Sequence, residues 1–372
     1  MLDVFVILIA VAALGWAILQ LFMSAPDHSR FDQPRHRLHR DPSTVSAENA
    51  EVIRLINSMQ IELRGVSKRK RLYRLRKIFD EGFTGSPATA EALGVDIEAA
   101  DAGGVKAEWV VAPGAETDRR LLYIHGGAFA IGSPVSHRMI TAALSRSCGV
   151  AVLAIDYRLL PEHFRRAAIA DCQSAYRYVI EHGPSGPRHA DEIHVAGDSA
   201  GGNLALMLSA WTRDLGLRCP DGVIAFSPST DSTLSNPSMT RNIHTDPMLG
   251  PGLGPLARLP ESLRLLFSAM TGLSNPRNPR MSPLFGNLGG LPPTLVQVSD
   301  CEMLSDDTLR YVNKARLQGS PVTVQVWPGM VHVWQMFQHV LPEAAHAIAE
   351  VAAFIAANSP RQQEADLAVG PA

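Results

Sequence analysis

The sequence predicts an α/β fold in which a mostly parallel sheet is flanked by helices and carries a helical cap. From residue 108 onward, short apolar runs alternate with segments of helical periodicity. One of these runs leads through a serine flanked by glycines directly into a helical pattern. A long stretch rich in proline and asparagine then interrupts the alternation. Because alternating strands and helices form βαβ crossovers, most strands are expected to be parallel.

The chain begins with an apolar segment that is long enough to cross a membrane. Residues 4–23 carry no charged side chain, and a helix of that length spans a hydrocarbon core of about 30 Å. A signal peptide is the rival interpretation, but no basic residue precedes the segment and the Ser-Ala-Pro that follows is a poor cleavage site. A buried or interfacial helix is the third alternative. We expect residues 1–24 to form an uncleaved transmembrane anchor.

Basic residues follow this segment and indicate an orientation. Residues 30–77 hold 13 Lys and Arg against five Asp and Glu, although the whole chain has a formal net charge of −2. The positive-inside rule then predicts a membrane-anchored protein with its catalytic domain in the cytoplasm. The cluster from Lys68 to Lys77 fits anionic headgroups and equally fits a solvated helix face. The near-neutral total gives no indication of a nucleic-acid partner, and the sequence leaves the oligomeric state open.

Composition is ordinary for a globular protein, and no cofactor-binding signature is present. Hydrophobic residues make up 46% of the chain, which is enough for a sizeable core. The four cysteines (Cys148, Cys172, Cys219 and Cys301) have neither C-x-x-C nor metal-ligand spacing, so reduced thiols are expected. No phosphate-binding or dinucleotide-binding motif is present. We therefore expect no metal and no cofactor.

The remaining chain divides into a tether, a catalytic domain and a tail. Residues 25–84 combine a polar tether with basic helices of the cap, including an amphipathic helix over 45–63. The catalytic domain covers residues 85–360, with a cap insertion at about 230–290, and residues 361–372 are expected to be a disordered tail. Strands are predicted at residues 108–112, 121–124, 150–155, 193–196, 223–226, 294–298 and 322–326.

The serine between strand and helix is Ser199, in a Gly-Asp-Ser-Ala-Gly motif at residues 197–201. Glycines two positions before and after it allow the backbone to turn sharply where strand and helix nearly touch. Such a strained turn lifts the hydroxyl to the edge of the sheet, in front of a helix N-terminus that favours negative charge. Ser199 is therefore the predicted nucleophile.

An acyl-transfer serine needs backbone N–H groups about 3 Å from the developing oxyanion. Residues 125–129, which read His-Gly-Gly-Ala-Phe, follow the strand at 121–124 and allow such an approach. We predict that Gly126 and Gly127 are donors, with Ala200 after the nucleophile as the third. His125 is expected to hold this loop by a hydrogen bond rather than to act as the general base.

The general base and its acid are sought after the later strands. His332 lies in a loop after the last predicted strand and is the best-placed of the 13 histidines. The acid should follow the strand at 294–298, because the chain order Ser, acid, His is typical of α/β-hydrolases. Asp306 and Asp307 begin the next helix, so Asp300 and Glu302 remain as candidates.

Six short motifs between about residues 105 and 355 together resemble the hormone-sensitive-lipase-like branch of the α/β-hydrolases. They lie at residues 125–129, 156–162, 197–202, 282–284, 290–293 and 329–332. The resemblance implies carboxylester hydrolysis without a cofactor and a cap built partly from the N-terminal helices. It places Glu302 at the position of the triad acid, and it implies a buried Asp156–Arg158 ion pair under the oxyanion loop. The chain departs from the family's usual His-Gly-Gly-Gly at Ala128.

The predicted function is thus a serine carboxylester hydrolase that acts on small to medium acyl esters, including lipid esters, through Ser199, His332 and Glu302. An amidase or deacetylase with the same triad is the alternative within enzymes. A ligand receptor on an inactive hydrolase fold is the alternative outside them, and the presence of all three triad residues counts against it.

Overall fold

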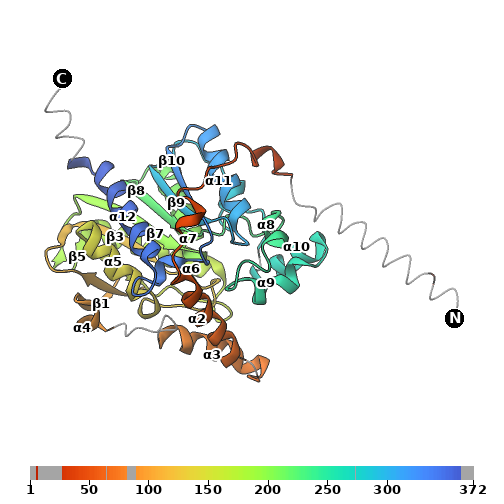
Figure 1. The fold of residues 1–372 in the computed structure, drawn as a ribbon. Helices are drawn as coiled ribbons and strands as arrows, with labels where there is room; N and C mark the ends of the chain where they lie inside the picture. The colour runs from red at the N-terminus through yellow and green to blue at the C-terminus, as the bar shows by residue number, and fades with distance from the viewer. Residues whose placement is uncertain (1–5, 7–26, 64, 82–88, 273, 362–372) are drawn as a thin grey trace.

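The computed structural model describes residues 6, 27–63, 65–81, 89–272 and 274–361, and an eight-stranded sheet lies at its centre (Figure 1). The strands are β1 (Asp96–Asp101), β2 (Lys106–Val111), β3 (Glu116–Ile124), β4 (Val150–Ile155), β7 (Glu192–Asp198), β8 (Gly222–Phe226), β9 (Thr294–Ser299) and β10 (Val322–Trp327). Two further strands of two residues each, β5 (His182–Gly183) and β6 (Gly186–Pro187), pair with each other in a separate antiparallel sheet.

The strand order is β1-β2-β4-β3-β7-β8-β9-β10. The strands from β4 to β10 are parallel, whereas β1 and β2 are antiparallel to their neighbours. All seven predicted strands are present and the mostly parallel sheet is confirmed. The prediction missed β1, because its sequence Asp-Ile-Glu-Ala-Ala-Asp consists mainly of residues that are rare in strands.

Helices cover both faces of the sheet. Helices α5 (Arg138–Cys148) and α12 (Pro342–Ala357) pack on one face, and α6 (Arg165–Glu181), α7 (Ala200–Asp214) and α11 (Ser305–Leu317) pack on the other. Alternate side chains of β3 enter the two cores, since Leu121 and Tyr123 pack with the first pair and Leu122 and Ile124 with the second group. Parallel strands buried on both faces read as continuous apolar runs, which is why the sequence revealed them.

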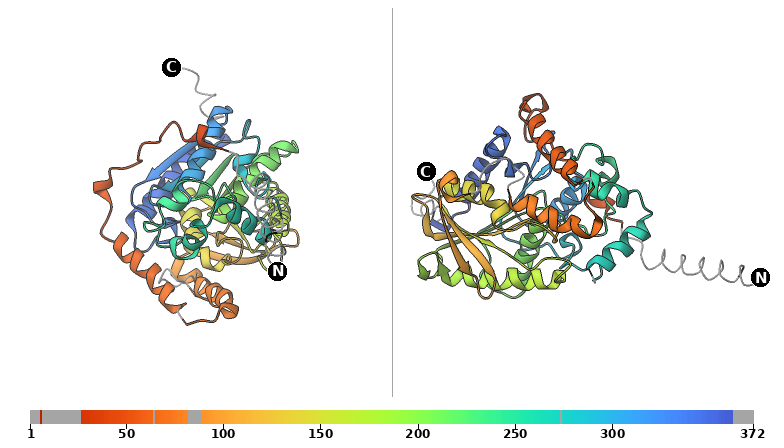
Figure 2. Two further views of the ribbon diagram at one scale, coloured as in Figure 1. Left: turned by 90° about the vertical axis from the view of Figure 1, so that its right-hand side faces the viewer. Right: turned by 90° about the horizontal axis from the view of Figure 1, so that it is seen from below.

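Two further groups of helices lie outside these layers. Helices α2 (Asn49–Glu62) and α3 (Lys68–Asp80) lie below the sheet in Figure 1, and α8 (Ser238–Arg241), α9 (Gly250–Ala257) and α10 (Glu261–Gly272) lie to its right. The views in Figure 2 show the two groups as neighbours, and Gln60 Nε2 of α2 donates a hydrogen bond to Pro247 O (3.4 Å). The short helices are α4 (Ala90–Leu93), η1 (Ser29–Phe31), η2 (Pro42–Thr44), η3 (Val135–His137), η4 (Pro283–Phe285) and η5 (Trp334–Met336).

Residues 27–44, which we call the N-terminal strap, run along the β10 edge of the sheet. Leu38 forms a parallel bridge with Val326, and the next N–H, that of His39, donates to Val326 O (2.7 Å). Asp32 pairs with the nearly buried Arg310 (2.6 Å) and fixes the strap to α11. The part of the tether that the structure describes is therefore bound to the domain through backbone and side-chain contacts.

The predicted location is corrected by the structure. Crossing a bilayer takes about 20 consecutive apolar residues. Within the described ranges no helix is both long and apolar enough, and the longest, α6, has 17 residues. The expectation of a membrane-anchored protein with a single N-terminal span and a cytoplasmic catalytic domain is therefore wrong. Residues 4–23, on which it depended, lie outside the described residues except for Val6, and so does the tail after Arg361.

The basic cluster at residues 68–77 forms ion pairs within the protein. Arg74 lies 2.7 Å from Glu62, Lys77 lies 3.4 Å from Glu81, and Arg76 lies 2.8 Å from Glu162 of a loop beside the sheet. The protein's own carboxylates therefore balance the charge of these three cations.

Candidate active site

The turn at Ser199 has the geometry of a nucleophile elbow. Strand β7 ends at Asp198, helix α7 begins at Ala200, and Ser199 between them has φ +51° and ψ −113°. A side chain on Gly201 would place its Cβ 1.9 Å from Ile124 O, and one on Gly197 would place it 2.5 Å from Gly201 O. Both glycines are therefore required by close backbone contacts, as the motif predicted.

Replacing Gly201 by alanine is expected to destabilise the fold by more than about 3 kcal/mol, because the clash is with a backbone carbonyl that cannot rotate away. The measurement is the urea midpoint of each purified variant, with Gly252→Ala as the matched control. A Cβ atom on Gly252 would have no other atom within 4 Å, and the φ of this residue is ordinary, so its midpoint should stay near the wild-type value. Equal midpoints for the two variants would contradict the packing argument.

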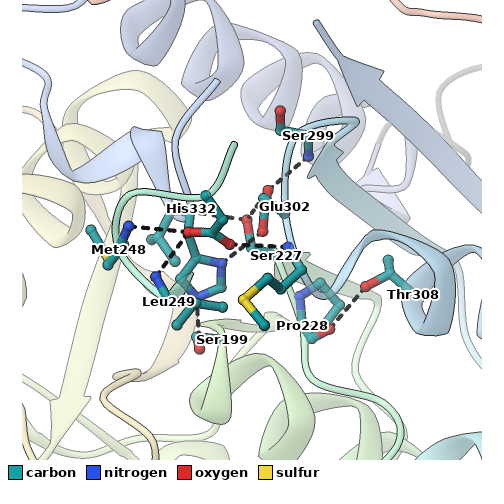
Figure 3. A network of polar contacts seen from close by, with 12 residues as sticks. Ser199, Ser227, Pro228, Met248, Leu249, Ser299, Glu302, Thr308 and His332 are labelled. Carbon is teal, nitrogen blue, oxygen red and sulfur yellow. Dashed lines mark hydrogen bonds and ion pairs between the residues drawn. The ribbon is translucent and has the colours of Figure 1, made fainter. Parts of the chain in front are cut away.

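Ser199, His332 and Glu302 form a continuous hydrogen-bonded row (Figure 3). The Ser199 hydroxyl donates to His332 Nε2 (2.9 Å), and His332 Nδ1–H donates to Glu302 Oε2 (2.7 Å). His332 and Glu302 are buried, whereas Ser199 is partly exposed. The structure thus brings together three residues that lie up to 133 positions apart in the chain. This arrangement can remove a proton from Ser199 and hold it on a positioned imidazole.

The two candidate acids have different partners. Glu302 contacts His332, and its other oxygen, Oε1, accepts hydrogen bonds from the Ser299 N–H (2.7 Å) and the Ser227 hydroxyl (2.8 Å). Asp300 Oδ1 instead accepts the backbone N–H of Gly329 (2.8 Å). Asp300 therefore fixes the loop that carries His332, while only Glu302 of the two lies against the imidazole.

The surroundings of His332 and Glu302 shift the pKa of both side chains. Burial alone would lower the pKa of His332, but the Glu302 hydrogen bond and the charges of Glu302 and Asp246 outweigh it and raise this pKa above 6.5. Burial raises the pKa of Glu302, and its hydrogen bonds from His332 and Ser299 offset part of that rise. The imidazole is therefore a stronger base than a free histidine side chain.

Sequence reasoning missed three residues that hold the acid. Ser227, directly after β8, donates to Glu302 and has φ +45°. Asn242, at the end of α8, donates from Nδ2 to Glu302 O (2.7 Å) and to Asp300 O (2.9 Å). The buried Asp246 accepts the N–H of Met303 (3.0 Å). For Ser227, its place at the carboxyl end of a central strand was an available signal.

The structure changes the assignment of the predicted oxyanion donors. The N–H of Gly126 donates to Asp198 Oδ1 (2.9 Å), so it is already paired and lies outside the predicted oxyanion hole. Within the described residues no acceptor contacts the N–H of Gly127 or Ala128. The N–H of Ala200 belongs to the first turn of α7, where N–H groups lack partners inside the helix.

The loop that presents these N–H groups is strained. Its backbone has positive φ at Gly127 (+108°), Ala128 (+54°) and Phe129 (+60°). Each left-handed residue other than glycine costs about 1–2 kcal/mol, so the surrounding structure must hold this conformation. Ala128 thus adopts a conformation for which glycine is the more usual residue.

Buried polar residues beneath the loop act as its support. His125 Nδ1–H donates to Gly126 O (2.7 Å), its ring stacks on Tyr157 (4.3 Å), and burial lowers its pKa to about 3. Tyr123 donates its hydroxyl to the same Asp198 oxygen that accepts from Gly126 (2.7 Å). His125 is therefore neutral and structural, in agreement with the sequence-based interpretation.

The ion pair that the family resemblance implied has a different acid. Arg158 pairs with Asp171 of α6 (2.6 Å) rather than with Asp156, and half of the Arg158 side chain is exposed. The Asp156 backbone N–H donates to Lys106 O (2.7 Å). The sequence could not identify this pair from the proximity of Asp156 and Arg158 alone. The partner that Arg158 binds, Asp171, lies 13 residues later in the chain, on α6.

Comparisons with known proteins agree with this architecture. Residues 121–336 match the family model described as alpha/beta hydrolase fold. An acetyl-hydrolase of Streptomyces hygroscopicus is 38% identical over 225 residues, which cover 60% of this chain and 70% of that protein. An esterase of Acinetobacter venetianus is 35% identical over 227 residues, covering 61% and 71% of the two chains.

A solved structure of an esterase from the bacterial hormone-sensitive lipase family is also similar. It superposes with a TM-score of 0.72 at 33% sequence identity, over 84% of this chain and 98% of that chain. The superposition therefore covers most of both chains. The chain therefore belongs to the α/β-hydrolase fold family, in its hormone-sensitive-lipase-like branch.

Proposed function

We propose that this protein is a serine carboxylester hydrolase that cleaves small to medium acyl esters through an acyl-enzyme. The observation that carries the proposal is the hydrogen-bonded row from Ser199 through His332 to Glu302. The names of its relatives, an acetyl-hydrolase and an esterase, support the same reaction class.

The reaction begins when His332 Nε2 takes the proton from the Ser199 hydroxyl as Oγ attacks the ester carbonyl carbon. Glu302 holds the imidazole in the required tautomer and stabilises its protonated form. The tetrahedral intermediate collapses, and His332 gives its proton to the leaving alcohol. Water then attacks the acyl-enzyme with His332 again as the base, which releases the acid and restores Ser199.

The oxyanion of each tetrahedral intermediate needs preorganised donors. We assign this role to the N–H groups of Gly127, Ala128 and Ala200, since the Gly126 N–H is already paired with Asp198. The two loop donors are consecutive residues of the strained turn, and within the described residues no acceptor takes either N–H, so both are available to one oxygen. The N-terminus of α7 adds a favourable dipole.

A cap over this site is a further part of the proposal. We assign it to α2 and α3 together with α8, α9 and α10. Buried Val52 and Ile56 of α2 pack in one cluster with the residues around His332, and Met248, in the α8–α9 connection, joins the same cluster. Residues that close the acyl pocket would then come from both groups, and their packing would set the accepted chain length.

The test is hydrolysis of p-nitrophenyl esters from C2 to C16 by the full chain, with the p-nitroanilides of the same acids alongside. Turnover that is highest on short and medium esters and weak on anilides is the expected result. Preference for anilides would instead indicate an amidase or deacetylase. Absence of turnover on every ester by the folded protein would contradict the proposal.

A further inference from the structure

One side chain of the basic helix α3, Arg76, reaches across to the loops beside the sheet. Its guanidinium makes four hydrogen bonds, all of them to residues on those loops. Nε donates to Ala130 O (2.8 Å) and Nη2 to Leu160 O (2.7 Å), while both terminal nitrogens contact the Glu162 carboxylate at 2.8 Å. The planar fork of arginine can satisfy these acceptors together, whereas a lysine ammonium cannot.

These acceptors belong to the loop that carries the proposed oxyanion donors or lie directly against it. Ala130 follows the left-handed residues Ala128 and Phe129, so the Nε bond fixes the end of the strained turn. The Leu160 N–H donates to Phe129 O (2.8 Å), and the Leu160 carbonyl accepts from Arg76. Arg76 thus holds the loop directly at Ala130 and a second time through the Leu160 peptide.

Two other contacts join the same helix to the loop. Ile131 packs against an apolar cluster formed by α2 and α3, which contains Ile78 and Phe79. The Ser133 hydroxyl donates to Asp80 at the end of α3. Helix α3 therefore contacts the loop at Ala130, Ile131 and Ser133, and Arg76 supplies the contacts nearest to the donors.

We propose that Arg76 is a positioning residue for ester hydrolysis, which holds the N–H groups of Gly127 and Ala128 in their oxyanion-binding orientation from the N-terminal helix α3. This inference rests on the proposed function. It gives Arg76 a positioning role beyond the covering role of α3, because loss of its contacts would free the strained turn to relax.

The ion pair persists over the pH range of an assay. The Arg76 hydrogen bonds lower the pKa of Glu162 to about 2, and the same pairing raises the pKa of Arg76. Loss of Arg76 should therefore leave the pH profile set by His332 unchanged. This separates a positional role from an electrostatic effect on the general base.

The experiment measures kcat and KM on a medium-chain p-nitrophenyl ester and the inhibition constants of two matched ketones. Ser199 Oγ adds to the carbonyl carbon of an alkyl trifluoromethyl ketone while the hydroxyl proton of Ser199 moves to His332. The carbonyl oxygen becomes an oxyanion that lies at the donors. The methyl ketone of the same length binds without forming that adduct. For Arg76→Ala we expect kcat to fall by about 10- to 100-fold and KM to change by less than about threefold.

The affinity of Arg76→Ala for the trifluoromethyl ketone should fall by the same factor as kcat, while its affinity for the methyl ketone stays near wild type. Arg76→Lys should behave like Arg76→Ala, because the fork is lost although the charge remains. Glu162→Gln keeps the donors to Ala130 and Leu160 and should show the smaller loss. Arg74→Gln is the control on the same helix as Arg76. It removes an exposed ion pair with Glu62 of α2 and should match wild type.

Wild-type kcat and wild-type trifluoromethyl ketone affinity in Arg76→Ala would overturn the inference, as would equal losses for both ketones. If Arg76→Ala fails to fold, Arg76→Lys and Glu162→Gln decide the question. The two quantities compared with wild type are again kcat and the affinity for the trifluoromethyl ketone relative to that for the methyl ketone. An inactive wild type would contradict the proposed function instead, so the two failures are distinguishable.

Discussion

Replacing Ser199 by alanine is expected to lower kcat/KM for p-nitrophenyl esters by about 10⁵- to 10⁶-fold, because no other group can form the acyl-enzyme. The residual rate would come from the oxyanion donors and substrate binding alone. The fold should persist, since the variant loses only the Oγ atom and its bond to His332 (2.9 Å). The measurement is steady-state hydrolysis together with labelling by an alkyl fluorophosphonate, which should modify the wild type but not Ser199→Ala.

Ser58→Ala is the matched control for this variant. The Ser58 hydroxyl lies on the exposed surface of α2 and donates to Leu55 O (2.7 Å), away from the triad. Its turnover and labelling should equal those of the wild type. Retention of more than about a hundredth of the wild-type rate in the folded Ser199→Ala protein would be incompatible with an obligatory acyl-enzyme.

Glu302→Gln should lower kcat by about 10⁴-fold, because an amide cannot stabilise the imidazolium and favours the wrong tautomer. Asp300→Asn is the matched substitution two residues earlier, and it removes the charge that faces the Gly329 N–H instead. Its kcat should stay within about tenfold of wild type, the cost of one weakened hydrogen bond. A larger loss in Asp300→Asn than in Glu302→Gln would assign the acid to Asp300.

The pH profile gives an independent measure of the same pair. Activity requires neutral His332, so kcat/KM falls as pH drops through the pKa of His332 in the free enzyme. The Glu302 contacts raise this pKa, which places the acidic limb of the wild type above pH 6.5. In Glu302→Gln burial still lowers the pKa but the carboxylate no longer raises it, so the limb should move to lower pH. A limb that stays in place would contradict the assigned partner.

Much of the fold and the triad could be predicted because the determining signals are local. The buried parallel strands are continuous apolar runs, and the elbow at Ser199 combines a motif with a strand before it and a helix after it. Residues at the carboxyl ends of neighbouring parallel strands meet at one edge of a sheet, so chain order suggested His332 and left Asp300 and Glu302 as candidate acids. The family resemblance then favoured Glu302.

The details that the sequence did not reveal depend on contacts between distant segments. Whether the Gly126 N–H faces a substrate or a carboxylate depends on Asp198, which lies 72 positions later. The partner of Arg158 depends on where helix α6 lies against the sheet. Arg76 was one of several cations on a basic helix, and nothing local distinguished it from Arg74 or Lys77. The tertiary packing determines these hydrogen-bond and ion-pair partners, and sequence pattern and spacing do not.

The N-terminal strap bears on how the protein can be shortened for laboratory work. Strand β10 ends the sheet, and the bridge of Leu38 to Val326 occupies hydrogen-bonding groups on its outer side. A truncation that removes the strap would leave these groups unpaired. The exposed edge of β10 could then pair with strands of other molecules. Shortened forms of the chain should therefore begin before Asp27, and variants that start after residue 44 are expected to elute as aggregates in size-exclusion chromatography.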